Sequence, residues 1–397
     1  MPWVASKAIA SHFRDIYGEI TPNHDLTGFW PEDDWEITEM LGQYGTKYCA
    51  VQSFKLVGLS VLELFCLSEG LLGPGEMRIR QTEDVPDNQI YFDVTLYYSS
   101  METIDYLKVG LARSRYSHQS EGHGLLLLSS DCLNLSKDIA KIVITCHLPH
   151  SKNGVPCKIK NFWTELPTFK HVVEYTSEDT LHLESFELCA SQQSIEMRSS
   201  ILANQVILKS YSGIIADISL VNVYDQTRRN SVARLEMSTL KGCINGVVRL
   251  EPSNTFVPSD IEEHQVVATC ETGSIRLSLL ELHACTPRFE RRRSSRINTA
   301  PRRFISRLRA RTNIGDVAVD ARGNKFEGHF AACTEKGRLS LKNRSQRSLR
   351  IAGSTRKNIF GFANGLSWLP TDPESRSSVE CGRISLSTRD GNISLLL

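Results

Sequence analysis

The sequence carries almost no net charge, and it contains no long apolar run. It holds 46 Lys and Arg residues against 45 Asp and Glu residues, a formal net charge of +1. This balance excludes strong overall attraction to any charged partner. The most apolar region is broken by charges, and its longest clean run, Leu56 to Leu62, is far shorter than the roughly 20 residues of a membrane-spanning helix. The first residues, MPWVASKAIASHFRD, lack the apolar core of a secretory signal. We therefore expect no transmembrane segment and favour an intracellular, cytoplasmic location.

The sequence also lacks the motifs of common catalytic and cofactor sites. It contains no nucleophile elbow, phosphate loop or dinucleotide fingerprint, and no C-x-x-C pair among its 11 cysteines. The cysteines are odd in number and widely spaced, which favours small buried residues in a reducing compartment over a disulfide framework. We assign no catalytic residue, no cofactor and no metal ligand.

One cluster of potential metal ligands does occur, in the segment CHLPHSKNGVPC. It brings Cys146, His147, His150 and Cys157 close together in the sequence. Their irregular spacing around Pro149 does not match zinc-site patterns. We therefore do not predict a metal site here.

The pattern of apolar and polar residues differs between the two sides of the glycine-rich segment GLLGPG. Residues 1–74 are predicted to form an N-terminal segment that is partly helical or irregular. Thr46 to Leu72 has helix-like apolar spacing, and Gly73, Pro74 and Gly75 would end a helix there. Residues 75–397 are predicted to form a β-repeat domain.

The repeat is clearest in Val206 to Leu220, VILKSYSGIIADISL. Apolar and polar residues alternate in two short arms around Gly213, as they do in strands with one buried face. The same pattern recurs, about 30 residues apart, at Gly242 and Gly273. It returns at Gly337, with a weaker copy near Gly323. Two further copies follow, at Gly382 and Gly391.

Such a period predicts units that bury their apolar faces by stacking on one another. The fold class is predicted to be all-β, with a β-solenoid (β-helix-like) repeat domain after a small, partly helical segment. A β-sandwich is the alternative, since short strands with regular turns fit it as well. Each corner glycine is expected to allow a turn in the backbone.

At these corners the chain resembles a known family. The segments YSGIIADISL, LKGCINGVVRL, TGSIRLSL and TRDGNISLLL resemble the repeats of the "putative adhesin-like domain" of unknown function, a β-helical repeat family found in bacteria and widely in fungi. The resemblance covers roughly residues 75–397 and is to the fungal-type members. It implies a β-helical fold and offers no catalytic residues. Fungal relatives often carry a membrane helix before the domain, and this chain departs from that pattern.

Two basic segments interrupt the repeat. An Arg-rich insert is predicted at residues 286–312, where ten arginines face one acid, Glu290. A basic loop at 342–357 adds six cations and no acid. These segments are either solvated loops or a surface that binds an anionic partner. The candidate anion- or partner-binding residues are Arg288, Arg291, Arg292, Arg293, Arg296, Arg302, Arg303, Arg307, Arg309 and Arg311. Ser294 and Ser295 follow three arginines and are candidate phosphorylation sites.

Three functional hypotheses follow from these patterns. The first is a non-enzymatic adhesin-like or interaction and scaffold module, whose partner is an unknown protein, glycan or anionic surface. The second is a carbohydrate-active β-helix enzyme of the polysaccharide lyase or hydrolase type, which needs carboxylates converging in one cleft. The third is binding to an anionic surface through the Arg-rich insert, although no specific nucleic-acid motif accompanies it.

Overall fold

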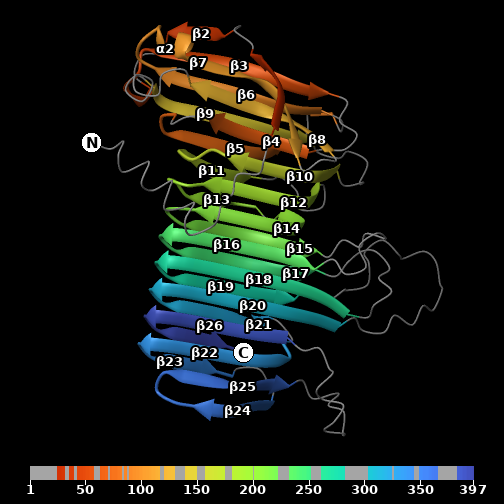
Figure 1. Ribbon diagram of the computed structural model, residues 1–397, viewed down its shortest axis with the longest axis vertical. Helices are drawn as coiled ribbons and strands as arrows, with labels where there is room; N and C mark the ends of the chain where they lie inside the picture. The colour runs from red at the N-terminus through yellow and green to blue at the C-terminus, as the bar shows by residue number, and fades with distance from the viewer. Residues whose placement is uncertain are drawn as a thin grey trace, which may run out of the picture. The chain divides into compact units, whose positions relative to one another are not determined.

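The computed structural model confirms the all-β class (Figure 1). It describes residues 25–31, 35–39, 43–57, 63–69, 72–82, 85–86, 89–116, 120–129, 139–149, 157–174, 181–199, 201–221, 232–251, 261–281, 303–323, 326–343, 348–364 and 382–397. The chain forms two compact units. Unit 1 comprises residues 1–200 and 208–213, and unit 2 comprises residues 201–207 and 214–397.

Unit 1 combines antiparallel and parallel strand pairs. Its elements are β1 (Asp25–Pro31), β2 (Glu36–Glu39), η1 (Gln43–Gly45), β3 (Tyr48–Val57), β4 (Glu63–Glu69), β5 (Gly75–Thr82), β6 (Gln89–Tyr98), α2 (Thr103–Tyr106), β7 (Leu107–Tyr116), β8 (Ser120–Ser129), β9 (Ile139–Pro149), β10 (Cys157–Glu165), β11 (Phe169–Glu174), β12 (Leu181–Ala190) and β13 (Ile195–Met197). One stack of strands runs β2–β3–β6–β9–β5–β11–β13, and the other runs β1–β7–β8–β4–β10–β12. In both stacks the pairs at the start are antiparallel and the later ones are parallel.

The structure differs from the helix expected over Thr46 to Leu72, because this stretch contains β3 and β4. Along the second half of β3, buried and exposed side chains alternate: Phe54 and Leu56 are buried, while Lys55 and Val57 are exposed. A short apolar run with mixed spacing fits both the helical period and the strand period. Here pairing with β6 makes the segment a strand. β4 pairs with β8 and β10, which lie after residue 75.

Unit 2 is built from strand pairs that repeat along the chain. Its elements are residues 201–207 of β14 (Ile201–Ser210), β15 (Ile214–Val221), β16 (Ala233–Lys241), β17 (Ile244–Glu251), β18 (Ile261–Thr272), β19 (Ile275–Glu281), β20 (Arg303–Ile314), β21 (Val317–Gly323), β22 (Gly328–Lys336), β23 (Leu339–Lys342), β24 (Ser348–Ser354), β25 (Asn358–Asn364), β26 (Gly382–Asp390) and β27 (Ile393–Leu396). In the pairs β16–β17, β18–β19, β20–β21, β22–β23 and β26–β27, a glycine corner joins the two strands, and these pairs stack on one another in parallel. This stacking is the arrangement expected for a β-solenoid.

The spatial order of the pairs departs from the order in the chain. One stack runs β16–β18–β20–β26–β22, and the other runs β15–β17–β19–β21–β27–β23, all in parallel. The C-terminal pair β26–β27 therefore lies between β20–β21 and β22–β23. β25 then pairs antiparallel with β22, and β24 pairs antiparallel with β25 (Figure 1).

The corner glycines act in turns, as the sequence predicted. Gly273 has φ 143°, and a Cβ there would meet the carbonyl oxygen of Gly242 at 2.1 Å. Gly315 has φ 138°, and a Cβ there would meet the carbonyl oxygen of Gly273 at 2.2 Å. A side chain at either corner would be strained by the backbone and would push adjacent corners apart. The corner between β20 and β21 is Gly315 and not the predicted Gly323, which ends β21. The predicted Gly382 is likewise no corner between two strands of a pair, because it is the first residue of β26.

Candidate interaction surface

Part of the predicted arginine site lies in a strand and not in a loop. Arg288, Arg291, Arg292, Arg293, Arg296, Arg302, Ser294 and Ser295 lie outside the described residues. Arg303 is the first residue of β20. Arg307, Arg309 and Arg311 alternate along β20 with buried Leu308, Ala310 and Thr312. The period-two pattern of a half-buried strand was thus present in the sequence but masked by the charge of the arginines. Likewise, part of the predicted basic loop at 342–357 is strand β24.

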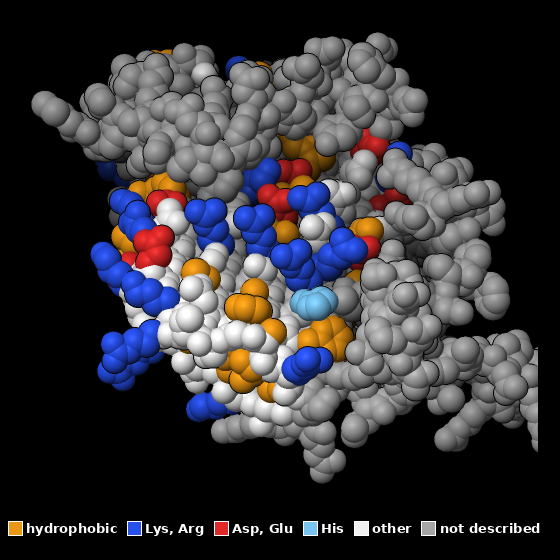
Figure 2. All heavy atoms as spheres, turned by 60° about the horizontal axis from the view of Figure 1, so that its bottom comes forward, with side chains coloured by type: hydrophobic (Ala, Val, Ile, Leu, Met, Phe, Trp, Pro, Cys, Tyr) orange, Lys and Arg blue, Asp and Glu red, His pale blue; other side chains and the backbone are white. Residues whose placement is uncertain are grey.

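The arginines of β20 are joined by another on the neighbouring strand. Arg383 of β26 lies directly opposite Arg307, while Ser385 and Ser387 lie opposite Arg309 and Arg311. Outward residues recur about 6.6 Å apart along a strand and about 4.8 Å apart across strands. We call Arg307, Arg309, Arg311 and Arg383 the arginine face. Figure 2 shows Lys and Arg side chains gathered on this part of unit 2, with apolar side chains beside them.

Among the four arginines of the arginine face, only Arg307 has an ion pair with a described acid. Arg307 donates from Nε to Glu263 at 3.1 Å, and both side chains are partly exposed, so this ion pair contributes little to stability. Within the described part of the chain, no acid is paired with Arg309, Arg311 or Arg383. Like charges at these spacings repel one another, so an anionic partner placed over them would relieve that repulsion.

Aromatic side chains lie on the same face of the sheet, on the strands beyond β26. The row that contains Arg383 runs on to His329 of β22, Phe362 of β25 and Arg350 of β24. The rings of His329 and Phe362 meet edge to face with centroids 5.0 Å apart. In the next row, Phe360 of β25 is 51% exposed. Its ring lies against Gly353, where a Cβ would come within 2.5 Å of it.

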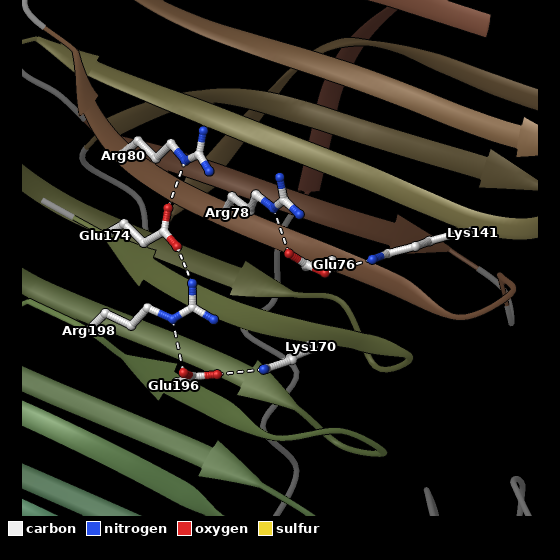
Figure 3. Close-up of polar contacts among 8 residues, drawn as sticks. All are labelled: Glu76, Arg78, Arg80, Lys141, Lys170, Glu174, Glu196 and Arg198. Atoms are coloured by element: carbon white, nitrogen blue, oxygen red, sulfur yellow. Dashed lines mark hydrogen bonds and ion pairs between the residues drawn. The ribbon is translucent and has the colours of Figure 1, made fainter. Parts of the chain in front are cut away.

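A second polar cluster lies on the outside of unit 1, along β9, β5, β11 and β13 (Figure 3). Each of its three carboxylates bridges two cations. Glu76 accepts from Arg78 at 2.5 Å and Lys141 at 2.7 Å. Glu174 accepts from Arg80 at 2.9 Å and Arg198 at 2.5 Å. Glu196 accepts from Arg198 at 2.9 Å and Lys170 at 2.5 Å.

These ion pairs determine what the carboxylates can do chemically. Burial acts to raise the pKa of Glu76, but the hydrogen bonds from Lys141 and Arg78 outweigh it and lower the pKa. Hydrogen bonds from Arg198 and Lys170 lower the pKa of Glu196. A general acid must hold its proton near neutral pH. Glu76 and Glu196 are therefore poorly suited to general-acid catalysis.

A third cluster centres on His147 in unit 1. The Nδ1 of His147 lies 3.0 Å from Thr82 Oγ1, and its Nε2 lies 2.9 Å from Asp93 Oδ2. Ser53 donates to Asp93 Oδ1 at 2.6 Å. The hydrogen bond with His147 is the main cause of a lowered pKa of Asp93.

The neighbouring Cys146 does not share this surface. Its side chain is fully buried, which raises the pKa of its thiol. The described residues contain no group of three or more His, Cys, Asp or Glu side chains arranged to hold a metal ion.

Comparisons with known proteins found similarity to solved structures only. No family model matches the chain, and no curated protein matches it. A "putative adhesin" from Parabacteroides distasonis aligns with 87% of this chain and 97% of its own, at 7% identity and a TM-score of 0.34. A "putative cell adhesion protein" from Clostridium sporogenes aligns with 87% and 99%, at 8% identity and a TM-score of 0.19. A "putative adhesin" from Parabacteroides merdae aligns with 68% and 95%, at 8% identity and a TM-score of 0.25.

The resemblance to fungal-type members of the adhesin-like family stays a prediction. Among the described residues, no helix is long and apolar enough to cross a membrane.

Proposed function

We propose that this protein is a non-enzymatic, adhesin-like interaction module that binds an anionic macromolecule through the arginine face. The observation that carries the proposal is the alignment of Arg307, Arg309 and Arg311 along β20, with Arg383 beside them on β26. Paired parallel strands hold these side chains at fixed intervals, so little conformational entropy of the backbone is lost on binding.

Arginine suits this role for chemical reasons. Its guanidinium group stays charged at all physiological pH values, and its planar fork matches carboxylate, sulfate and phosphate groups. The small net charge of the whole chain argues for attraction that is local to this surface. Binding should therefore depend on a few arginines and weaken with added salt.

Retention on immobilised heparin, used as a generic polyanion, tests the proposal. We expect the R309Q/R311Q variant to elute at a lower salt concentration than the unmodified protein. The matched control is R276Q, which removes an exposed arginine from β19 in the other strand stack of unit 2. Elution of R309Q/R311Q together with the unmodified protein would contradict the proposal.

The competing hypothesis is a carbohydrate-active β-helix enzyme. It predicts release of reducing or unsaturated ends from an acidic polysaccharide such as polygalacturonate. Such release, abolished by replacing one carboxylate, would overturn the non-enzymatic part of the proposal.

A further inference from the structure

The arginine face and the aromatic residues of β25 form two parallel lines on one sheet. Arg309 and Arg311 define the first line along β20, and Phe360 and Phe362 define the second along β25. β26 and β22 lie between these strands. Three inter-strand spacings of about 4.8 Å place the two backbones roughly 14 Å apart.

The surface between the two lines carries small side chains. Ser385 follows Arg309 in the same row, and Ala331 and Phe360 come after it. Ser387 and Cys333 take the equivalent places beside Arg311. A ligand that spans from Arg309 to Phe360 therefore meets only Ser385 and Ala331 on these two strands, whereas Arg383 and His329 lie in the row of Phe362.

The distance between the arginines of β20 and the aromatic rings of β25 distinguishes between classes of polyanion. In an acidic glycan each charged group is attached to the sugar ring itself, so cations and aromatic residues that bind it should lie together. In a nucleic-acid strand the phosphate and the base lie on opposite sides of the sugar. Phosphates held along β20 would leave the bases to extend across β26 and β22 toward β25.

The form of the aromatic residues favours a single strand over a duplex. Only an unpaired base can place its flat face on Phe360, and such stacking on aromatic residues is a general mode of single-strand binding.

We propose that this sheet binds single-stranded nucleic acid, with phosphates along the arginine face and bases stacked on Phe360. The inference rests on the proposed function, because it names the partner of the same surface.

Fluorescence anisotropy of the full-length chain with labelled oligothymidylate about 16 nucleotides long tests this inference. We expect F360A to weaken binding about tenfold, because one base loses its stacking partner. We expect R309Q/R311Q to reduce the slope of log affinity against log salt by about 1.4, because each phosphate contact on a single strand contributes about 0.7. R276Q should leave both quantities unchanged.

Two further comparisons separate this inference from a folding defect and from general polyanion binding. F360L keeps an apolar side chain against Gly353 while it removes the ring, so we expect it to weaken binding as F360A does. A duplex of matching length should bind less tightly than the single strand. The inference is overturned if oligothymidylate does not bind, if F360A and F360L bind as the unmodified protein does, or if the duplex binds equally well. In those cases, earlier elution of R309Q/R311Q from heparin would leave the proposed function intact. If R309Q/R311Q behaved as the unmodified protein in both assays, both proposals would be overturned.

Discussion

Individual buried histidines link the stability of each unit to pH. His171 in unit 1 is fully buried, and its ring nitrogens lie 2.8 Å from Thr164 Oγ1 and 3.2 Å from the carbonyl oxygen of Phe169. His264 in unit 2 is also buried. Burial disfavours the charged imidazolium, and it lowers the pKa of each residue from 6.5 to about 4. The unfolded chain therefore binds protons more readily than the folded chain between these pH values.

We predict that the free energy of unfolding falls as pH decreases from about 6.5 toward 4. The stabilisation from the buried neutral form is fully present above 6.5, and at pH 5 each histidine has lost about 2 kcal/mol of it. Urea denaturation of H171Q at pH 7 and pH 5 should show a smaller difference between the two pH values than the unmodified protein. The exposed His329 provides the control, since H329Q should retain the original difference. A pH dependence of H171Q equal to that of the unmodified protein would contradict the prediction.

At the scale of elements, a column of side-chain hydroxyl and thiol groups holds neighbouring corners of unit 2 together. Each group lies three residues before a corner glycine and donates to the glycine carbonyl of the adjacent corner. Cys270 donates to Gly242 at 3.2 Å, and Thr312 donates to Gly273 at 2.9 Å. Thr388 donates to Gly315 at 2.9 Å, and Thr334 donates to Gly391 at 2.8 Å. A Ser, Thr or Cys three residues before glycine is thus a sequence signal for these corners that apolar alternation alone does not reveal.

We predict that T388V lowers the free energy of unfolding by about 1 kcal/mol or more. The valine matches threonine in shape but leaves the Gly315 carbonyl without this donor. T388S keeps the hydroxyl and should cost less. T269V changes an outward-facing threonine of β18 and should be nearly neutral. Equal stability of T388V and T269V, measured by urea denaturation, would show that the column does not contribute.

At the scale of the whole molecule, the last strands of the chain complete the middle of a stack. β26 and β27 fill the position between β20–β21 and β22–β23, so their apolar side chains Ile384, Leu386, Ile393 and Leu395 are all buried. Among the described strands, β22 and β23 pair in parallel with β26 and β27 alone, whereas β20 and β21 also pair with β18 and β19. The terminal segment thus joins the β22–β25 region to the rest of unit 2.

We predict that removing residues 382–397 releases β22–β25 from unit 2. Hydrogen exchange followed by mass spectrometry should show loss of protection in β22 and β25, while β16 and β17 keep theirs. A peptide of residues 382–397 added in trans should restore part of the protection. R383Q, which changes only an exposed side chain of β26, serves as the control. Retained protection of β22 in the truncated chain would contradict the prediction.

Local patterns in the sequence determined the fold class and most of the corners. Alternation in Val206–Leu220 and its copies required strands with one buried face, and the recurring glycines marked where the backbone turns, because both depend on residues next to one another. Only the tertiary structure decided the rest. β3 and β4 are strands because they pair with distant partners, and β26–β27 takes its place by pairing with strands that come before it in the chain. The arginine face likewise arises because parallel pairing places Arg383 beside Arg307. Antiparallel pairing of β25 with β22 then sets Phe360 on the same sheet, and no local period encodes which distant strands become neighbours.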